Sequence, residues 1–149
     1  MSLSKKEKNL IKTIAGRDLV GMYEKAGDLF LEIIPSSIVR VSTMLCAHED
    51  MGFKTLMDAF VVDNLSSLGK FSIYYQLYSH DIKERLFIEI GIENQEQALS
   101  LSIVFSNVVW YEREIFDLFG IVFINNPDLR RILNPHDYNE FPLRKELLL

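Results

Sequence analysis

Residues 70–92 read KFSIYYQLYSHDIKERLFIEIGI, and this stretch decides the class of fold. Residues 70–78 are rich in aromatic and β-branched side chains, which favour extended strands. Residues 85–92 alternate between apolar and polar side chains, the period of a half-buried strand. The polar pair His80–Asp81 separates the two runs. The stretch therefore predicts an antiparallel β-hairpin.

The residues before the hairpin predict four more elements. Their apolar periodicity indicates the helices and strands, and glycine and proline residues indicate where these elements end. Ser36 and Ser37 are typical caps for the second helix, whose Val39, Met44 and Leu45 are expected to face inward. The expected elements are a helix over residues 9–23 interrupted near its glycines, a strand over 29–34, a helix over 36–48 and a strand over 53–63.

The residues after the hairpin predict one last amphipathic helix over residues 102–119, with Gly120 at the position just past its end. The order is then helix, strand, helix, three strands, helix. This order indicates an α+β fold, in which a small mixed or antiparallel sheet carries its helices packed on one face.

The C-terminal part has a different composition. Residues 124–149 hold three of the four prolines and show no sustained period. We therefore expect a body domain over residues 1–123 and an extended irregular tail over 124–149. The tail carries Phe141, Leu143 and a final run of leucines, which are poor residues to leave in water. Two interpretations stay open: the tail docks on partner subunits, or it folds back over its own sheet.

Bulk properties narrow the class of protein. The 149 residues suit one ordinary domain, and the net charge is −5, with basic residues at both ends and an acidic middle. An acidic body argues against nucleic acid as the main partner, because phosphate binding needs a basic face. No apolar run reaches the roughly 18 residues of a membrane span, so we expect no direct membrane span. A single cysteine excludes an intramolecular disulfide.

Chemical motifs are mostly missing from the sequence. It has no phosphate-binding loop, no dinucleotide turn and no cysteine set for an iron–sulfur cluster. His48, His80 and His136 lie in separate segments and favour surface or capping roles. Cys46 lies on an apolar helix face, where we expect it to be buried and inert. The sequence thus predicts no catalytic, cofactor-binding or metal residues in this chain.

The densest cluster of charge is WYEREIFDLFG at residues 110–120. Apolar residues occupy most of the helix circumference here, so some of the charges must be buried and must have partners. Arg113 and Asp117 are spaced to pair along the helix. Glu112 and Glu114 need cations from elsewhere, and the nearest unclaimed ones belong to the tail: Arg130, Arg131, Arg144 and Lys145. We hypothesise an ion-pair network that clamps the tail to this helix or to a partner subunit.

Two other interpretations of the cluster compete with this network. Glu112 and Glu114 could form a general acid/base pair. Two positions apart on a helix, however, they point about 200° away from each other, which is poor geometry for one shared substrate. The cluster could also be a solvated run of charges, although its aromatic flanks disfavour this.

Three motifs together resemble a known family: WYEREIFDLFGIVF at 110–123, PDLRRIL at 127–133 and PLRK at 142–145. They are similar to the signature of the 30 kDa subunit of respiratory complex I, also called NADH dehydrogenase subunit 9. The resemblance covers roughly residues 36–146. The chain departs from the usual pattern at Asn125–Asn126, at Glu140–Phe141 and after Lys145. The matching signature or interface positions are Trp110, Glu112, Arg113, Glu114, Asp117, Phe119, Gly120, Pro127, Leu129, Arg130, Arg131, Pro142, Leu143, Arg144 and Lys145.

The resemblance implies a non-catalytic scaffold subunit in the peripheral arm of NADH:quinone oxidoreductase, which passes electrons from NADH to quinone and translocates protons. It implies that flavin mononucleotide, iron–sulfur clusters and quinone belong to the assembled complex. Implied partners are the large quinone-site subunit, of the 49 kDa type, and neighbouring iron–sulfur subunits. The implied location is the cytoplasmic face of a bacterial inner membrane or the matrix face of a mitochondrial one. Alternatives are the equivalent subunit of a membrane-bound nickel–iron hydrogenase or formate hydrogenlyase, and a free-standing enzyme using carboxylates.

Overall fold

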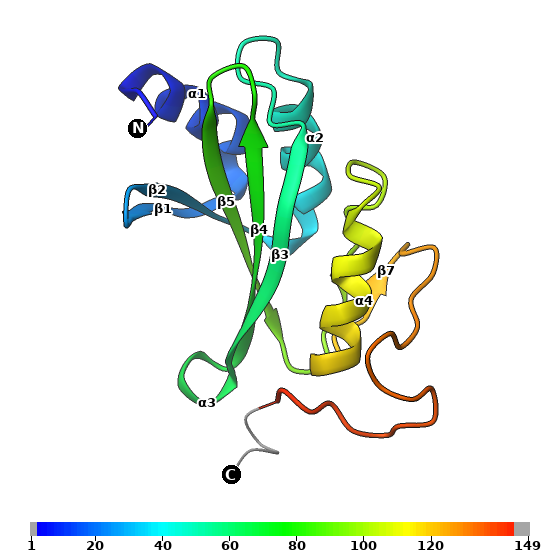
Figure 1. Cartoon of the computed structure of the whole chain (residues 1–149). Helices are drawn as coiled ribbons and strands as arrows, with labels where there is room; N and C mark the ends of the chain where they lie inside the picture. Colours follow the sequence, from blue (N-terminus) through cyan, green and yellow to red (C-terminus); the bar gives the residue numbers. More distant parts are fainter. Residues whose placement is uncertain (1–2, 145–149) are drawn as a thin grey trace.

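The computed structural model describes residues 3–144, which form an α+β fold (Figure 1). Two short 3₁₀ turns, Gly16–Asp18 and Pro35–Ser37, precede β1 and α2. The elements in chain order are α1 (Lys5–Ala15), β1 (Leu19–Lys25), β2 (Asp28–Ile33), α2 (Ile38–Ala47), β3 (Thr55–Asn64), α3 (Leu65–Leu68), β4 (Lys70–Ser79), β5 (Glu84–Glu93), β6 (Ala98–Leu99), α4 (Val108–Phe119) and β7 (Phe123–Ile124).

The main sheet is mixed and has the strand order β1-β2-β5-β4-β3. Strands β2 and β5 run parallel, and the other neighbours run antiparallel. The predicted hairpin is confirmed as β4 and β5, in a register that sets Ile73 opposite Ile90. A second sheet joins β6 and β7 in parallel.

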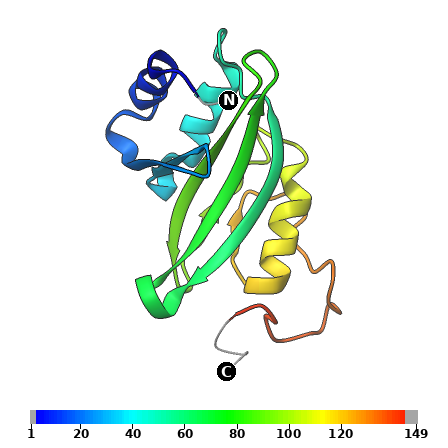
Figure 2. The ribbon, with the colours of Figure 1, turned by 60° about the vertical axis from the view of Figure 1, so that its left-hand side comes forward.

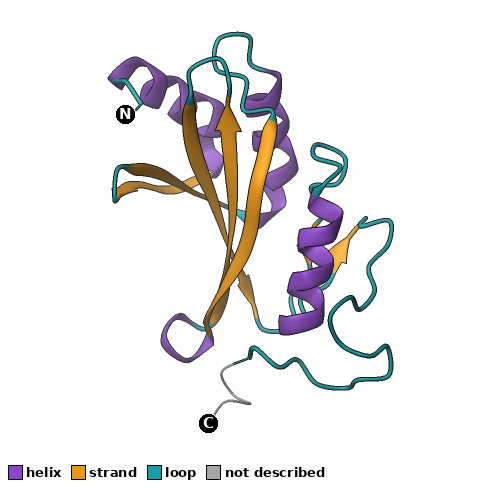
Figure 3. Cartoon of the chain, in the orientation of Figure 1, coloured by secondary structure: helices purple, strands orange, loops and turns teal. Residues whose placement is uncertain are grey.

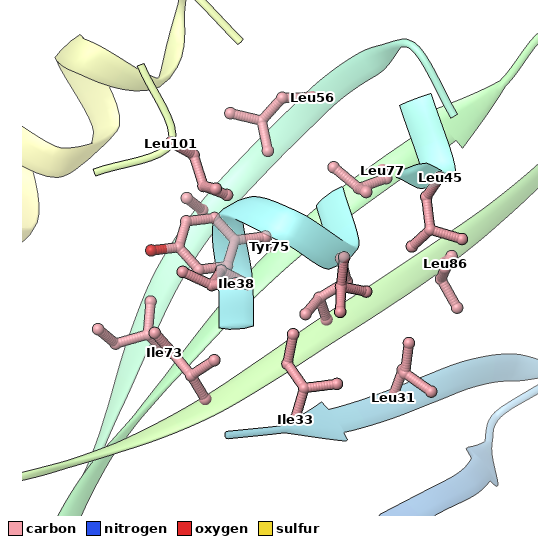
Figure 4. Close-up of a cluster of buried hydrophobic side chains, with 14 of the residues drawn as sticks. Leu31, Ile33, Ile38, Leu45, Leu56, Ile73, Tyr75, Leu77, Leu86 and Leu101 are labelled. Atoms are coloured by element: carbon pink, nitrogen blue, oxygen red, sulfur yellow. The ribbon is translucent and has the colours of Figure 1, made fainter. Parts of the chain in front are cut away.

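Helices α1, α2 and α4 lie on one side of the main sheet, whereas α3 joins β3 to β4 at one end of the sheet (Figures 1 and 3). Helices α1 and α2 lie behind the sheet, and α4 runs beside β3, where Asn107 donates to the Leu56 carbonyl. The core fills the space between the sheet and α2, with Ile38 and Leu45 facing Tyr75 and Leu77 (Figure 4). In the part of the chain that the structure describes, no helix covers the opposite face of the sheet (Figure 2).

One predicted element is wrong. Residues 19–23 do not continue the first helix, because they belong to β1, which pairs antiparallel with β2. Helix α1 begins early, at a capping box between Ser4 and Glu7, and it ends at Gly16, whose φ is +58°. A helix over residues 19–25 would leave the outer edge of β2 without backbone partners, whereas a strand there satisfies them.

The second helix differs from the prediction in its details. Ser36 and Ser37 belong to a 3₁₀ turn before α2, and the Ser37 side chain at the N-cap makes no capping hydrogen bond. Its inward residues include Ile38, Val41 and the predicted Leu45, whereas Met44 is 45% exposed and Val39 is half-buried. Cys46 is also only partly buried, against the expectation.

His48 follows α2 directly and has a capping role, one of the two roles (surface or capping) that the sequence favours. Its ring nitrogen Nδ1 accepts the backbone N–H groups of Asp50 and Met51, at 3.1 and 3.3 Å.

The last helix begins at Val108, six residues later than predicted. The residues before it form β6 and a series of turns instead, and the Leu101 N–H bonds to the Glu112 carboxylate. None of the helices within residues 3–144 has the length and apolar character needed to cross a membrane.

Candidate functional site

Helix α4 carries the charged cluster and ends as predicted. Gly120 takes a left-handed conformation, with φ of +77°, and its N–H donates to the Phe116 carbonyl. A residue with a side chain would be strained in this conformation. The chain then turns back, so residues 125–144 run down one side of α4 and past its C-terminal end (Figure 1).

Asp117 and Arg131 form the centre of the site. The Asp117 side chain is fully buried, and its Oδ1 accepts from Arg131 Nη1 at 2.9 Å. Its Oδ2 accepts the backbone N–H groups of Ile132, Leu133 and Asn134, at 3.1, 2.6 and 2.9 Å. Burial alone would raise the pKa of Asp117, but the hydrogen bonds from Arg131 and Asn134 hold that pKa well below its usual value.

Arg131 ties the rest of the tail to the same point. Its Nη2 donates to the Tyr138 carbonyl at 2.5 Å, and its guanidinium carbon lies 4.9 Å from the centre of the Phe141 ring. Farther along, Arg144 donates to the Phe119 carbonyl at 2.6 Å. An ion pair therefore clamps the tail to α4, as hypothesised, but the helix contributes Asp117 to this pair and not Glu112 or Glu114.

Arg113 does not pair with Asp117, and this part of the prediction is wrong. Its guanidinium donates to the carbonyls of Arg130 and Arg131 at 3.3 and 3.2 Å, and it lies 3.5 Å from a carboxylate oxygen of Asp128. The tail offers Arg113 several acceptors in the direction away from the helix, whereas Asp117 already accepts from residues 131–134. The same guanidinium lies 4.9 Å from the centre of the Trp110 ring.

Glu112 is fully buried, and its partners within residues 3–144 are neutral, contrary to the expectation of an arginine or lysine from the tail. Its carboxylate accepts from the Ser100 hydroxyl at 2.7 Å, the Leu101 N–H at 2.8 Å and the Asn126 side-chain amide at 2.8 Å. Burial raises the pKa of Glu112, and these three donors oppose the increase. The carboxylate joins the residues after β6 and the start of the tail to the middle of α4.

Glu114 is exposed to solvent, and its side chain forms no hydrogen bond or ion pair within residues 3–144. Glu112 is buried and Glu114 is exposed, so the two carboxylates lie on different faces of α4, as their spacing predicted. The solvated-run interpretation fails for this helix, because Glu112, Arg113 and Asp117 are all buried.

The other signature positions divide between packing and exposure. Phe119 meets Phe71 edge-on at 6.1 Å, and Leu129 packs against the core. Lys145 lies outside the described residues. Trp110 is 59% exposed, while Pro127, Arg130 and Leu143 are also exposed and Pro142 is half-buried.

Sequence reasoning missed the neutral members of this network: Ser100, Asn126, Asn134 and Tyr138. The need of buried carboxylates for donors was a usable signal, but it did not indicate which amide or hydroxyl would supply them. Among the described residues, no group of histidine, cysteine and carboxylate side chains is arranged to hold a metal ion.

A family model described as the 30 kDa subunit of respiratory-chain NADH dehydrogenase matches residues 31–149. The chain belongs to this family. The match covers the whole charged network and its tail, as well as the sheet from Leu31, in the middle of β2, onward.

Several members of the 30 kDa subunit family align with most of the chain. NADH-ubiquinone oxidoreductase subunit 9 of Reclinomonas americana is 31% identical over 99% of this chain and 76% of its own length. The corresponding NADH-quinone oxidoreductase subunit of Paramagnetospirillum magneticum is 34% identical over 89% of this chain and 67% of its own length. The same subunit of Ruegeria pomeroyi is 33% identical over 80% of this chain, which spans 60% of that relative.

Solved structures share the fold at lower identity. The trypsin-resistant fragment (1-134) of Nqo5 superposes with a TM-score of 0.66 at 20% identity, over 82% of this chain and 98% of that one. The membrane-bound sulfane sulfur reductase, an archaeal respiratory complex, contains a chain with a TM-score of 0.75 at 16% identity, over 95% of this chain and 85% of that one.

Proposed function

We propose that this chain is a scaffold subunit, without catalytic residues of its own, in the peripheral arm of an NADH:quinone oxidoreductase. Membership of the 30 kDa subunit family carries this proposal. Flavin mononucleotide, iron–sulfur clusters and quinone then belong to other subunits of the assembly, and so do the transfer of electrons from NADH to quinone and proton translocation.

The geometry of α4 supports a structural role for the signature charges. Glu112, Arg113 and Asp117 are buried and hydrogen-bonded to the tail and to the residues after β6. Groups held in this way fix the path of the tail across the helix. Chemistry on a substrate would instead require them to face an open cleft.

The surface over this clamp supports a docking role for the tail residues 124–149. The Arg113 guanidinium lies on the Trp110 ring while it bonds to the carbonyls of Arg130 and Arg131, so these segments border one surface. These segments carry exposed apolar side chains: Trp110 is 59% exposed, Ile132 39% and Leu133 62%. Exposed aromatic and aliphatic side chains on a well-ordered base are typical of protein interfaces.

We further propose that this surface meets the large quinone-site subunit, of the 49 kDa type, and neighbouring iron–sulfur subunits. The assembly would then hold the chain peripherally at the cytoplasmic face of a bacterial inner membrane, or at the matrix face of a mitochondrial one. The relatives from Reclinomonas, Paramagnetospirillum and Ruegeria are named as subunits of NADH-ubiquinone or NADH-quinone oxidoreductase, which favours this proposal over the hydrogenase alternative.

The test of assembly is a native gel of gently solubilised membranes that contain the chain with a tag. We expect the tagged chain to migrate with subunits that carry flavin and oxidise NADH. Migration with a nickel–iron subunit would instead show that the chain belongs to a membrane-bound hydrogenase complex. Recovery as a free monomer with turnover of its own would overturn the scaffold role.

The test of the docking surface is the substitution Leu133→Asp, with Leu68→Asp as its matched control. The two leucines are 62% and 63% exposed, and Leu68 lies on α3, which joins β3 to β4 and is not part of the clamp (Figure 1). We expect both variants to unfold at the same denaturant concentration as the parent chain, and only Leu133→Asp to lower the recovered assembly. Equal recovery of both variants would contradict docking at the tail.

A further inference from the structure

No described helix covers one face of the main sheet (Figure 2). This face carries an array of aromatic side chains. Tyr23, Phe30 and Phe87 stack in a row across β1, β2 and β5, with ring centres 5.1 and 4.6 Å apart. Phe60 and Tyr74 stack at 5.1 Å on β3 and β4, and edge contacts of 6.1 and 6.4 Å join them to the row. Tyr23 is 40% exposed and Phe60 37%.

Glu89 lies in the middle of this aromatic face and is only 8% exposed. Its two carboxylate oxygens accept from the hydroxyls of Tyr23 and Tyr74, at 2.8 and 3.1 Å. Burial, together with the negative charge of Glu89, raises the pKa of both phenols, which stay protonated and donate. Neutral hydroxyls hold the carboxylate in place but do not neutralise it.

The neighbouring carboxylates of the same face each have a cation. Glu32 pairs with Lys70 at 3.2 Å, and Asp28 pairs with Arg85 at 2.5 Å. Glu89 forms no ion pair within residues 3–144, although it stands next to Glu32 in the register of β2 and β5. The aromatic face therefore contains one largely buried carboxylate without a positive partner among the described residues, beside a second carboxylate.

We propose that this face docks a partner subunit that projects an arginine onto Glu89 and the surrounding rings. A guanidinium is planar, stacks on aromatic faces and can pair with a carboxylate, so it matches both features of the surface. The partner is thus a protein with a basic, arginine-bearing surface, on the side of the chain opposite to the helices.

The carboxylates of the aromatic face disfavour two other partners at this surface. A second copy of this chain would bring Glu32 and Glu89 of both copies together, and like charges in a dry interface are costly. A membrane surface rich in anionic lipid would be repelled by the same carboxylates, and the chain carries a net charge of −5. An arginine from a partner adds the charge that the face lacks.

The proposal rests on the scaffold function and is tested in the native assembly. A photo-reactive benzoyl-phenylalanine replaces Phe60, which is exposed and aromatic, and the cross-linked peptide is identified by mass spectrometry. The same residue at Leu68, outside the aromatic face, is the control. We expect Phe60 to yield a peptide of another subunit that contains an arginine, and Leu68 not to yield that peptide. A cross-link to a second copy, to lipid or to nothing overturns the inference.

Charge exchange tests the role of Glu89 itself. We expect Glu89→Gln to lower the recovered assembly about tenfold, a change of roughly 1.4 kcal/mol in association. Glu32→Gln should leave assembly near the parent level, because Glu32 already has Lys70. Glu89→Arg should abolish docking, and an Arg→Glu change in the cross-linked peptide should restore it. Absence of that restoration contradicts the proposed contact.

Two measurements keep the outcomes distinct. The unfolding midpoint of each purified variant separates a folding defect from a docking defect. Little change of this midpoint is expected for Glu89→Gln, because the new side-chain amide keeps an oxygen that can accept from a tyrosine hydroxyl. Co-migration of the parent chain with the NADH-oxidising subunits, together with a failed cross-link, would leave the scaffold function standing and remove only this interface.

Discussion

At the scale of single residues, the environment of each charge on α4 decides its role more than its position in the motif does. Asp117 and Glu112 are both fully buried, yet among the described residues Asp117 bonds to an arginine and Glu112 bonds only to neutral donors. Their pKa values therefore move in opposite directions.

The first prediction concerns the adjacent arginines of the tail. Arg131→Gln leaves the buried Asp117 without its charged partner, so we expect a loss of about 3 kcal/mol in the free energy of unfolding. Arg130→Gln removes an exposed pair with Asp128 and should cost less than about 1 kcal/mol. Urea unfolding of the two variants measures the difference. Equal losses of unfolding free energy in the two variants would show that the buried pair of Arg131 with Asp117 stabilises the fold no more than an exposed pair does.

The second prediction compares the two glutamates. Glu112→Ala deprives Ser100, Leu101 and Asn126 of their acceptor, and buried donors without acceptors cost about 1–3 kcal/mol each. We expect a total loss of at least roughly 3 kcal/mol, against less than about 0.5 kcal/mol for the exposed Glu114→Ala. Thermal unfolding followed by circular dichroism measures both. A stable Glu112→Ala variant would contradict the network.

The third prediction concerns pH. Because the pKa of folded Asp117 lies below its ordinary value of 3.8, its ionised form stabilises the fold above that value. The difference in the free energy of unfolding between the parent chain and Asp117→Asn should be constant from about pH 5 to 8. This difference should become smaller below about pH 4. Urea unfolding at a series of pH values measures this difference.

Glu112 provides the contrasting sign for the same titration. Its pKa is raised above 4.5, so its ionisation costs stability as the pH rises through the folded value. The difference in the free energy of unfolding between the parent chain and Glu112→Ala should therefore grow as the pH falls toward the pKa that Glu112 has in the unfolded chain. If the two differences in the free energy of unfolding changed in the same direction with pH, the environments assigned to Asp117 and Glu112 would be wrong.

At the scale of elements, the end of α4 sets the course of the tail. A Cβ atom at Gly120 would lie 2.7 Å from the Phe141 ring, in addition to the strain of a positive φ. Phe141 in turn lies under the guanidinium groups of Arg131 and Arg144. The turn after the helix and the return of the tail are therefore one structural unit.

The fourth prediction uses the matched glycines at two helix ends. Gly69 and Gly120 have φ values of +70° and +77°, but a Cβ at Gly69 would meet nothing within 4 Å. We expect Gly69→Ala to cost about 1 kcal/mol from backbone strain alone, and Gly120→Ala at least roughly 2 kcal/mol. Hydrogen exchange should show faster exchange of the Leu143 N–H, which bonds to the Leu118 carbonyl, only in Gly120→Ala.

At the scale of the whole molecule, the chain has two unlike surfaces. The helical side carries the clamp with its exposed tryptophan and leucines, and the open sheet carries the aromatic face around Glu89. A scaffold that contacts different neighbours needs two such surfaces, each held on a rigid base. The division into a body over residues 1–123 and a tail over 124–149 stays a prediction, which a truncation tests.

The fifth prediction is that a chain cut after Ile124 unfolds more readily than the full chain. The cut removes the partners of Asp117, Arg113 and one donor to Glu112, and it exposes three charged groups that were buried. We expect a loss of several kcal/mol and a Tm lower by about 10 °C or more. Full retention of the midpoint would show that the body folds without its tail.

The sequence by itself determined the hairpin, the α+β class, the end of α4 at Gly120 and the burial of part of its charged cluster. These features depend on local periodicity, on backbone preference and on the cost of burying charge, all of which are readable over a few residues. It did not determine that residues 19–25 form a strand, because a strand there is favoured by the unpaired edge of β2.

Only the tertiary structure decided which partner each buried charge takes. Arg113, Asp117 and Glu112 had several candidate partners in the sequence, and the path of the tail selected among them through backbone N–H and carbonyl groups as much as through side chains. The aromatic face around Glu89 likewise arises from strands set side by side. Such juxtapositions join residues that are distant along the chain, so no local pattern of the sequence specifies them.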